Sequence, residues 1–378
     1  MTTHLKSRSS SWKLGKKQYS NINFSEPIGC IYENKQGVFL TYKGKTKKKK
    51  NISCISLIEK FLKKGHYACG YFSFEFLNKK INKTEYKAIF NLYERKNILK
   101  KTPHTTHLNK KDTLKKLQTD KHFLDGIRKA KNYIKNGDIY QINLTREFSF
   151  APPNNPHNLF LQYYSQQPVD YASYIEFPDH VLISGSMELF LEKTNNTIKT
   201  KPIKGTASVA NKTKNQINND QKELAENLMI VDLMRNDLSR VCKTGSVVSK
   251  KLFRKKKYAT LYQLESEVEG KLKKNIKTTS IFKNTMPPGS VTGAPKSRAI
   301  EIIREIEKHH RGPYCGAIGM FEPNGNFCFS VGIRICKIKN NDARFYTGAG
   351  IVWDSVPKKE NNETMLKAKA FRLSLEKR

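Results

Sequence analysis

One lysine and five glutamates are the residues of this chain whose types and spacing could do chemistry together. Lys204 lies in the run Pro202-Ile-Lys-Gly-Thr206, where a proline and a glycine constrain the backbone. A lone carboxylate, Glu188, lies upstream in Ser186-Met-Glu-Leu189. Two acidic pairs with i,i+3 spacing follow, Glu223/Glu226 and Glu360/Glu363. A deprotonated lysine attacks carbon and carboxylates bind hard cations, so this set predicts an amine nucleophile beside a metal ion.

The acidic pairs have a plainer interpretation as well. Residues three apart share one face of a helix, and acids near a helix N-terminus also complement its dipole without binding metal. If the pairs do bind a metal, Mg²⁺ suits them, because it accepts carboxylates and keeps several waters. The sequence has no His/Cys spacing of the kind that binds zinc.

Two further segments suggest anion binding. The run from Gly289 to Lys296 precedes a predicted helix, but its spacing and Pro295 do not fit the nucleotide phosphate loop. Backbone N–H groups at that helix start could still hold a carboxylate. Arg334 is expected in the middle of a strand between apolar residues, where it requires a buried anion as a partner.

The chain is strongly basic, with a formal net charge of +37 over 378 residues. Lysine outnumbers arginine 56 to 14, whereas a phosphate-binding groove usually favours arginine with interleaved aromatic residues. The lysine runs Lys47–Lys50 and Lys255–Lys257 are expected in solvated loops. We therefore expect no nucleic acid as the primary partner, and attraction of small anionic substrates as the use of this charge.

Apolar runs, targeting signals and cysteines indicate the cellular compartment of the protein. No run of apolar residues is long enough to span a membrane, and no secretory signal is evident at the start. The seven cysteines contain no C-x-x-C, which favours reduced, unpaired thiols. We expect a cytoplasmic protein without membrane partners; import into an organelle by the basic first residues is the alternative.

Apolar periodicity predicts an α+β fold. Strands come in meander-like groups separated by helices rather than in strict βαβ alternation. We expect large, mostly antiparallel sheets packed against each other with helices outside, an α/β/β/α layering, with the active site between these layers. The expected helices are 123–135, 220–234, 295–309 and 361–376. The expected strands are 38–42, 70–75, 138–150, 181–184, 189–192, 315–321, 327–337 and 344–347.

Three regions are expected along the chain. Residues 1–26, which are rich in Ser and Lys, are interpreted as a basic disordered or transit-like arm. Residues 27–118 form an N-terminal segment and a linker that complete the fold. Residues 119–378 form the catalytic domain.

Six motifs in residues 120–378 match one family closely. They are Gly137-Asp-Ile-Tyr-Gln-Ile-Asn-Leu144, Pro202-Ile-Lys-Gly-Thr206, the run from Glu226 to Asp237, the run from Pro287 to Arg298, Arg311-Gly-Pro-Tyr-Cys-Gly316 and Gly348-Ala-Gly-Ile-Val-Trp-Asp-Ser355. On these motifs the chain resembles the chorismate-utilising enzymes, and within them the first components of the aminodeoxychorismate synthases. Further upstream, the run from Gly70 to Glu75 is weakly similar to a strand of the same family.

The resemblance implies roles for the residues above. Glu226 and Glu360 would be the main Mg²⁺ ligands, supported by Glu223 and Glu363. Glu188 would be the general acid that protonates the leaving C4 hydroxyl of chorismate, and Lys204 the nucleophile that adds at C2. The carboxylate contacts of the substrate would come from Ser290, Tyr314, Arg334, Gly348, Gly350 and Lys367.

Three positions discriminate within the family by resemblance. Gln141 stands where isochorismate and salicylate synthases carry a water-activating lysine, which disfavours attack by water. Lys204 stands where anthranilate synthases carry alanine. Gln263 replaces a histidine of many relatives, and an amide cannot carry a proton at neutral pH, which disfavours elimination of pyruvate.

The resemblance also implies partners. Chorismate and ammonia would be substrates, and a separate glutamine amidotransferase subunit would supply the ammonia, because no Gly-x-Cys-x-Gly nucleophile turn occurs in the chain. The expected product is 4-amino-4-deoxychorismate, on the route to 4-aminobenzoate and folate. Two alternatives stay open: the first component of an anthranilate synthase, and an inactive relative that binds RNA through its basic surface.

Overall fold

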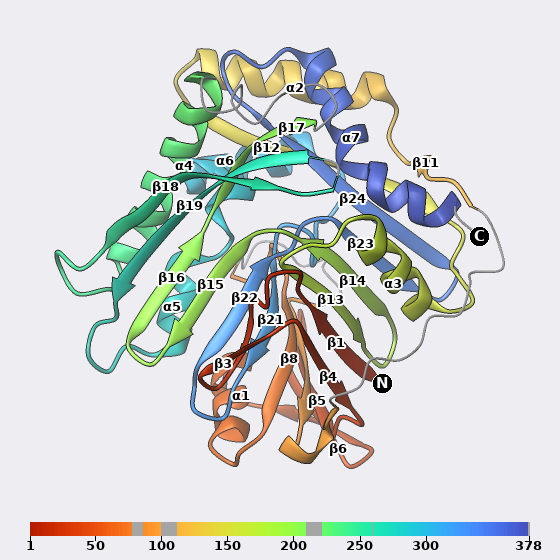
Figure 1. Ribbon diagram of the computed structural model, residues 1–378, viewed down its shortest axis with the longest axis vertical. Coiled ribbons are helices and arrows are strands. Elements are labelled where there is room, and N and C mark those ends of the chain that lie inside the picture. Colours follow the sequence, from red (N-terminus) through yellow and green to blue (C-terminus); the bar gives the residue numbers. More distant parts are fainter. Residues whose placement is uncertain (78–85, 100–111, 209–220, 260, 377–378) are drawn as a thin grey trace.

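Two large antiparallel sheets and seven helices make up the computed structural model, which describes residues 1–77, 86–99, 112–208, 221–259 and 261–376 (Figure 1). One sheet has ten strands and the other twelve. The helices are α1 (Cys54–Leu62), α2 (Asp120–Lys135), α3 (Pro156–Gln166), α4 (Gln221–Ser239), α5 (Thr278–Thr285), α6 (Lys296–Ile306) and α7 (Pro357–Glu376), with 3-10 turns η1 (Arg95–Asn97) and η2 (Gly289–Val291). The α+β class expected from the sequence is confirmed.

The ten-stranded sheet combines strands from both ends of the chain. In spatial order it contains β10 (Ile98–Leu99), β4 (Asn21–Ser25), β1 (Thr2–Lys6), β13 (Tyr171–Glu176), β14 (Val181–Ser186), β23 (Ile335–Lys339), β24 (Asp342–Ile351), β12 (Gln141–Phe150) and β11 (Lys115–Lys116), with β20 (Gly293–Ala294) also beside β12. Helices α2, α3, α6 and α7 pack against its strands.

The twelve-stranded sheet likewise joins distant segments. Its order is β17 (Ile203–Ser208), β19 (Leu261–Lys271), β16 (Thr197–Lys201), β15 (Leu189–Thr194), β22 (Phe327–Val331), β21 (Ala317–Phe321), β8 (Tyr67–Phe72), β9 (Ala88–Tyr93), β5 (Gly29–Asn34), β6 (Gly37–Tyr42) and β7 (Lys45–Lys49), with β18 (Val248–Lys257) beside β19. Helices α1 and α4 pack against it.

The first 26 residues are not a disordered arm, so that expectation is wrong. β1 pairs with both β13 and β4. A hairpin of β2 (Trp12–Leu14) and β3 (Lys17–Tyr19) lies between β1 and β4 in the sequence. Leu5, Trp12 and Phe24 are fully buried in an apolar cluster that includes Cys69 of the other sheet. Burial of these apolar side chains between the sheets stabilises the segment.

The expected strand over residues 327–337 is in fact two strands in different sheets. β22 ends at Val331 in the twelve-stranded sheet, and β23 begins at Ile335 in the ten-stranded one. Arg334 has a φ of +54° in the connection, far from the extended conformation of regular strand residues. The placement of Arg334 in mid-strand is therefore wrong.

The lysine runs lie on strands and not in solvated loops as expected. Lys47–Lys49 belong to β7, the last strand of the twelve-stranded sheet, and Lys255–Lys257 belong to β18, which pairs only with β19. Charged side chains on such edge strands oppose pairing with another chain. Their lack of apolar alternation concealed the strands from sequence reasoning.

Most of the other expected elements occur with shifted ends. The helix expected over 220–234 continues to Ser239, and the one expected to reach residue 309 ends at Ile306. Helices α1, α3 and α5 and the long strand β19 were not predicted. All seven cysteines are free, as expected, and all seven are buried. Among the described helices, none combines the length and apolarity needed to cross a membrane. The expected linker lies largely in 100–111, outside the described residues.

Candidate functional site

A single pocket brings together all but one of the residues singled out from the sequence. Its walls come from β17 and β19 of the twelve-stranded sheet, β12 and β24 of the ten-stranded sheet, the turn η2, and helices α4 and α7, with Glu188, Tyr314 and Arg334 on connecting segments. The residues expected at the site that line it are Glu188, Lys204, Glu223, Glu226, Gln263, Ser290, Tyr314, Arg334, Gly348, Gly350, Glu360, Glu363 and Lys367.

Lys204 reaches the pocket from a bulge in β17. The pairing with β19 shifts register between Lys204 and Thr206, and Gly205 in between has a φ of +74°. A side chain would be strained at this positive φ, and a Cβ on Gly205 would lie 2.8 Å from Oε2 of Glu223, so glycine is favoured here. The Lys204 amine lies 3.9 Å from Oε2 of Glu226, and its side chain is 12% exposed.

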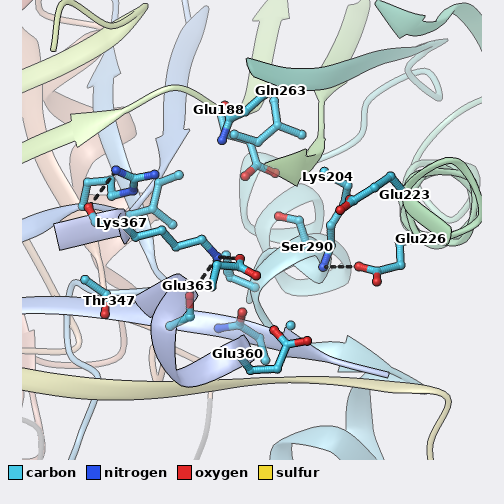
Figure 2. Close-up of a pocket in the computed structure, with 18 of the residues that line it drawn as sticks. Glu188, Lys204, Glu223, Glu226, Gln263, Ser290, Thr347, Glu360, Glu363 and Lys367 are labelled. Atoms are coloured by element: carbon cyan, nitrogen blue, oxygen red, sulfur yellow. Dashed lines mark hydrogen bonds and ion pairs between the residues drawn. The ribbon is translucent and has the colours of Figure 1, made fainter. Parts of the chain in front are cut away.

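The four paired glutamates face the pocket from two helices. Figure 2 shows Glu223 and Glu226 on one side of the pocket and Glu363 with Lys367 on the other. The i,i+3 spacing puts each pair on one helix face, at the first turns of α4 and α7. Lys367 Nζ contacts Glu363 Oε1 at 2.5 Å. Burial alone would raise the pKa of Glu363, but the charge and hydrogen bond of Lys367 lower it overall.

The carboxylate oxygens of the glutamates are suitable donors for a magnesium ion, although the glutamates do not converge on one point in this structure. Within the described residues, no three His, Cys, Asp or Glu side chains converge closely enough to hold a metal. Glu226 and Glu363 instead each lie beside a lysine. A set of carboxylates on facing walls, with room for water between them, is nevertheless the donor set that Mg²⁺ accepts.

Glu188 lies where the chain passes from one sheet to the other. It follows β14 of the ten-stranded sheet and precedes β15 of the twelve-stranded sheet, and its carbonyl accepts the Val331 N–H at 3.0 Å. Burial raises the pKa of its carboxyl to about 7, against the lowering effects of a hydrogen bond with Ser290 and the charge of Lys204. A carboxyl with this pKa holds a proton near neutral pH and can donate it.

Arg334 lies at another crossing between the sheets, between β22 and β23. Its guanidinium donates to the carbonyl of Lys367 at 2.8 Å and is almost fully buried. Lys367 Nζ donates in turn to the carbonyl of Gly348 at 2.9 Å. A Cβ on Gly348 would lie 3.1 Å from the Tyr314 hydroxyl, so the glycine leaves that hydroxyl room. Two cations and a phenol thus meet at this end of the pocket, an arrangement suited to a carboxylate.

Gln141 is the predicted residue that does not line the pocket. It is fully buried on β12, and its Nε2 lies 3.5 Å from where a Cβ on Gly350 would stand. Neither of its amide atoms has a hydrogen-bond partner among the described residues. Gln263 does line the pocket, and its Oε1 likewise has no hydrogen-bond partner within the residues that the structure describes.

Sequence reasoning missed several pocket residues. They are the apolar residues Ile203, Val291 and Ile333, the polar residues Asn143 and Thr347, and Gly205. Ile203 and Gly205 flank Lys204 inside a motif already singled out. Asn143 lies two residues from Gln141 on the same strand, a period-two signal that could have found it.

Comparisons with known proteins give a family match over most of the chain. The family model described as chorismate binding enzyme matches residues 32–373. The anthranilate synthase component 1 of Aquifex aeolicus is 37% identical over 68% of the chain and 53% of its own length. The aminodeoxychorismate synthase component 1 of Bacillus subtilis is also 37% identical, over 68% of the chain and 56% of its length. The chain thus spans about half the length of the curated relatives it matches.

A solved structure extends the likeness to the whole fold. The crystal structure of anthranilate synthase component I from Streptococcus pneumoniae superposes with a TM-score of 0.81 at 25% identity, covering 93% of this chain and 91% of that one.

Proposed function

The chain belongs to the chorismate binding enzymes, and from this premise we propose that it aminates chorismate at C4 with ammonia to form 4-amino-4-deoxychorismate. The observation that carries the proposal is the position of the Lys204 amine. It lies beside Glu226 in the pocket that Glu188 also lines. An amine at this place can act as a covalent nucleophile, a role that alanine could not take.

The first half-reaction uses Lys204 and Glu188. The deprotonated amine adds to C2 of the ring, the C1=C2 and C5=C6 double bonds shift to C1=C6 and C4=C5, and the C4 hydroxyl leaves. Glu188 supplies the proton that makes this leaving group water. Its pKa of about 7 keeps a substantial protonated fraction near neutral pH.

The second half-reaction reverses the shift. Ammonia adds at C4, the double bonds return to C1=C2 and C5=C6, and the C2–N bond to Lys204 breaks. The proton lost by the added ammonia balances the one gained by the departing amine. The pyruvyl ether at C3 stays intact throughout.

The remaining residues bind and orient the substrate. Arg334, Tyr314 and Lys367 would hold the pyruvyl carboxylate at the cationic end of the pocket, with Ser290 and the backbone of Gly348 beside them. Glu226, Glu360, Glu223 and Glu363 would hold Mg²⁺, which when bound supplies a positive charge for the ring carboxylate. A separate glutamine amidotransferase would supply the ammonia, as the component 1 names of the relatives suggest.

One experiment tests the covalent step directly. The purified chain is incubated with chorismate and Mg²⁺ without ammonia, quenched, and digested for mass spectrometry. We expect a chorismate-derived adduct on the peptide that contains Lys204. Turnover to 4-amino-4-deoxychorismate by a chain that never carries such an adduct would contradict the proposal.

The second candidate is the anthranilate synthase reaction, because a relative with that name is equally similar in sequence and the crystal structure of another has the same fold. It would release anthranilate and pyruvate from the same substrates. The two activities separate in one fluorescence assay, since 4-amino-4-deoxychorismate gives no aromatic product until a lyase is added. Lys204 and Gln263 support the first candidate.

A further inference from the structure

Arg311 is a fully buried cation that lies behind the pocket and does not line it. Its guanidinium forms two hydrogen bonds with Glu307, from Nε to Oε2 at 2.9 Å and from Nη2 to Oε1 at 2.7 Å. It also lies over the ring of Phe74, 4.5 Å from its centroid. Glu307 balances the charge, but a buried ion pair adds little net stability. The remaining contacts of Arg311 therefore indicate what it does.

Those contacts join two separate walls of the pocket. Nη1 donates to the carbonyl of Val291 at 2.9 Å, and Nη2 donates to the carbonyl of Asn143 at 2.5 Å. Both residues line the pocket, Val291 from η2 directly after Ser290, and Asn143 from β12. One rigid, planar side chain thus fixes the distance between these walls, which a flexible point charge cannot do.

The backbone of Arg311 holds a third wall. Its carbonyl accepts the Tyr314 N–H at 3.0 Å, closing the turn that presents Tyr314 to the pocket. The carboxylate of Glu75 accepts the N–H groups of Arg311 and Gly312 at 3.0 and 3.1 Å. The carbonyl of Gly312 accepts the Phe74 N–H at 2.7 Å. The N-terminal half of the chain therefore anchors this turn.

We propose that Arg311 is the positioning residue that sets the placement of Ser290, Asn143 and Tyr314 relative to one another, and thereby the fit of the carboxylate end of the substrate. The inference rests on the proposed function for the identity of that substrate. Arg311 does not line the pocket itself. It therefore acts through the lining residues that it holds in place. A misplacement of these walls by about 1 Å is expected to weaken productive binding roughly 10- to 100-fold.

The test compares two buried arginines. Arg311→Lys keeps a positive charge for Glu307 but cannot bridge both carbonyls. Arg146→Lys is the matched control, because Arg146 is equally buried and its partners, Asn361, Asp120 and the Gln118 carbonyl, do not line the pocket. Both variants are expected to lose stability. Only Arg311→Lys is expected to raise the KM for chorismate by roughly 10-fold or more, with the KM for ammonia unchanged.

Hydrogen–deuterium exchange gives a readout that needs no substrate. In Arg311→Lys, exchange is expected to increase in peptides covering 289–294 and 312–316, and in Arg146→Lys it is expected to stay unchanged there. Faster exchange without any chorismate turnover by the unchanged chain would uphold the positioning role and reject the proposed function. Unchanged exchange in Arg311→Lys, or an equal KM increase in both variants, would overturn the inference.

A milder variant covers the case in which Arg311→Lys fails to fold. Glu75→Gln leaves one acceptor oxygen for two backbone N–H groups, so it loosens the Tyr314 turn while keeping Arg311 and Glu307. It is expected to increase exchange in 312–316 and to raise the KM for chorismate several-fold. Normal exchange in this turn together with a normal KM would likewise reject the positioning role.

Discussion

The Lys204 amine lies 3.9 Å from a carboxylate oxygen of Glu226, at the point where a strand of one sheet faces the first turns of α4. The proposed nucleophile and the first predicted metal ligand are therefore neighbours in the wall of the pocket. A Cβ on Gly350 would lie 2.7 Å from the same amine. The lysine therefore lies close both to a carboxylate and to a residue that has no side chain.

Replacing the lysine should remove the amination reaction. Lys204→Ala is expected to lower the rate of 4-amino-4-deoxychorismate formation by about two orders of magnitude or more, because no other amine of the described pocket lies beside Glu226. The rate is measured with ammonia and a coupled lyase. Lys201→Ala is the control, since Lys201 pairs with Glu267 outside the pocket. Equal activity of both variants would argue against the covalent role.

Loss of one acidic ligand should remove the dependence on magnesium. Glu226→Gln is expected to lower turnover by about 10²-fold and to abolish its stimulation by Mg²⁺, because a neutral amide binds the ion weakly. Turnover is followed over a Mg²⁺ titration. Asp232→Asn on the exposed face of the same helix is the control. If Mg²⁺ still stimulated turnover in the Glu226→Gln variant, the ion would have to bind elsewhere.

The pH dependence of turnover should report Glu188. Its pKa of about 7 predicts that kcat falls as pH rises through 7, because the acid form that protonates the leaving hydroxyl is depleted. The profile is measured at a fixed concentration of free NH3, so that protonation of ammonia does not contribute. Glu188→Gln should lower kcat by about 10²-fold and remove this falling limb. A limb that persists in Glu188→Gln belongs to another group.

The same carboxyl should reduce stability at alkaline pH. Because its pKa is higher in the folded chain than the usual value of 4.5, the folded state binds the proton more tightly, and the stability it contributes is lost as pH rises from 4.5 through 7. Glu188→Gln is then expected to be about 1 to 3 kcal/mol more stable than the unchanged chain at pH 8. Urea unfolding at pH 8 and pH 4 measures this. A difference that does not shrink at pH 4 would contradict the assignment.

A methyl group beside the nucleophile should impair chemistry without unfolding the chain. Gly350→Ala introduces a Cβ that meets only the mobile end of Lys204 at close range, so stability should change little. Displacement of the amine by about 1 Å is expected to lower turnover up to roughly 100-fold. Gly348→Ala differs, because its Cβ would lie 2.6 Å from the Leu144 carbonyl and should destabilise the fold. Thermal unfolding together with kcat separates the two effects.

Local pattern explains what could be predicted about the site. The i,i+3 glutamate pairs lie on α4 and α7 because helical periodicity is a property of neighbouring residues. The constrained run around Lys204 does form a bulge at Gly205. Such features need only a few adjacent residues, so the sequence by itself specified the α+β class, the helices that carry the acids, and the identity of the lysine.

The tertiary structure decided everything that depends on distant pairing. Glu188 and Arg334 face the pocket because the chain changes sheets at both residues, and no local signal marks a change of sheet. The first residues pair with β13, far along the chain, with Thr3 opposite Ile175, and their composition alone suggested disorder. Arg311 joins three walls that are far apart in sequence. Strand register and burial are set by non-local contacts, which a reading of adjacent residues does not contain.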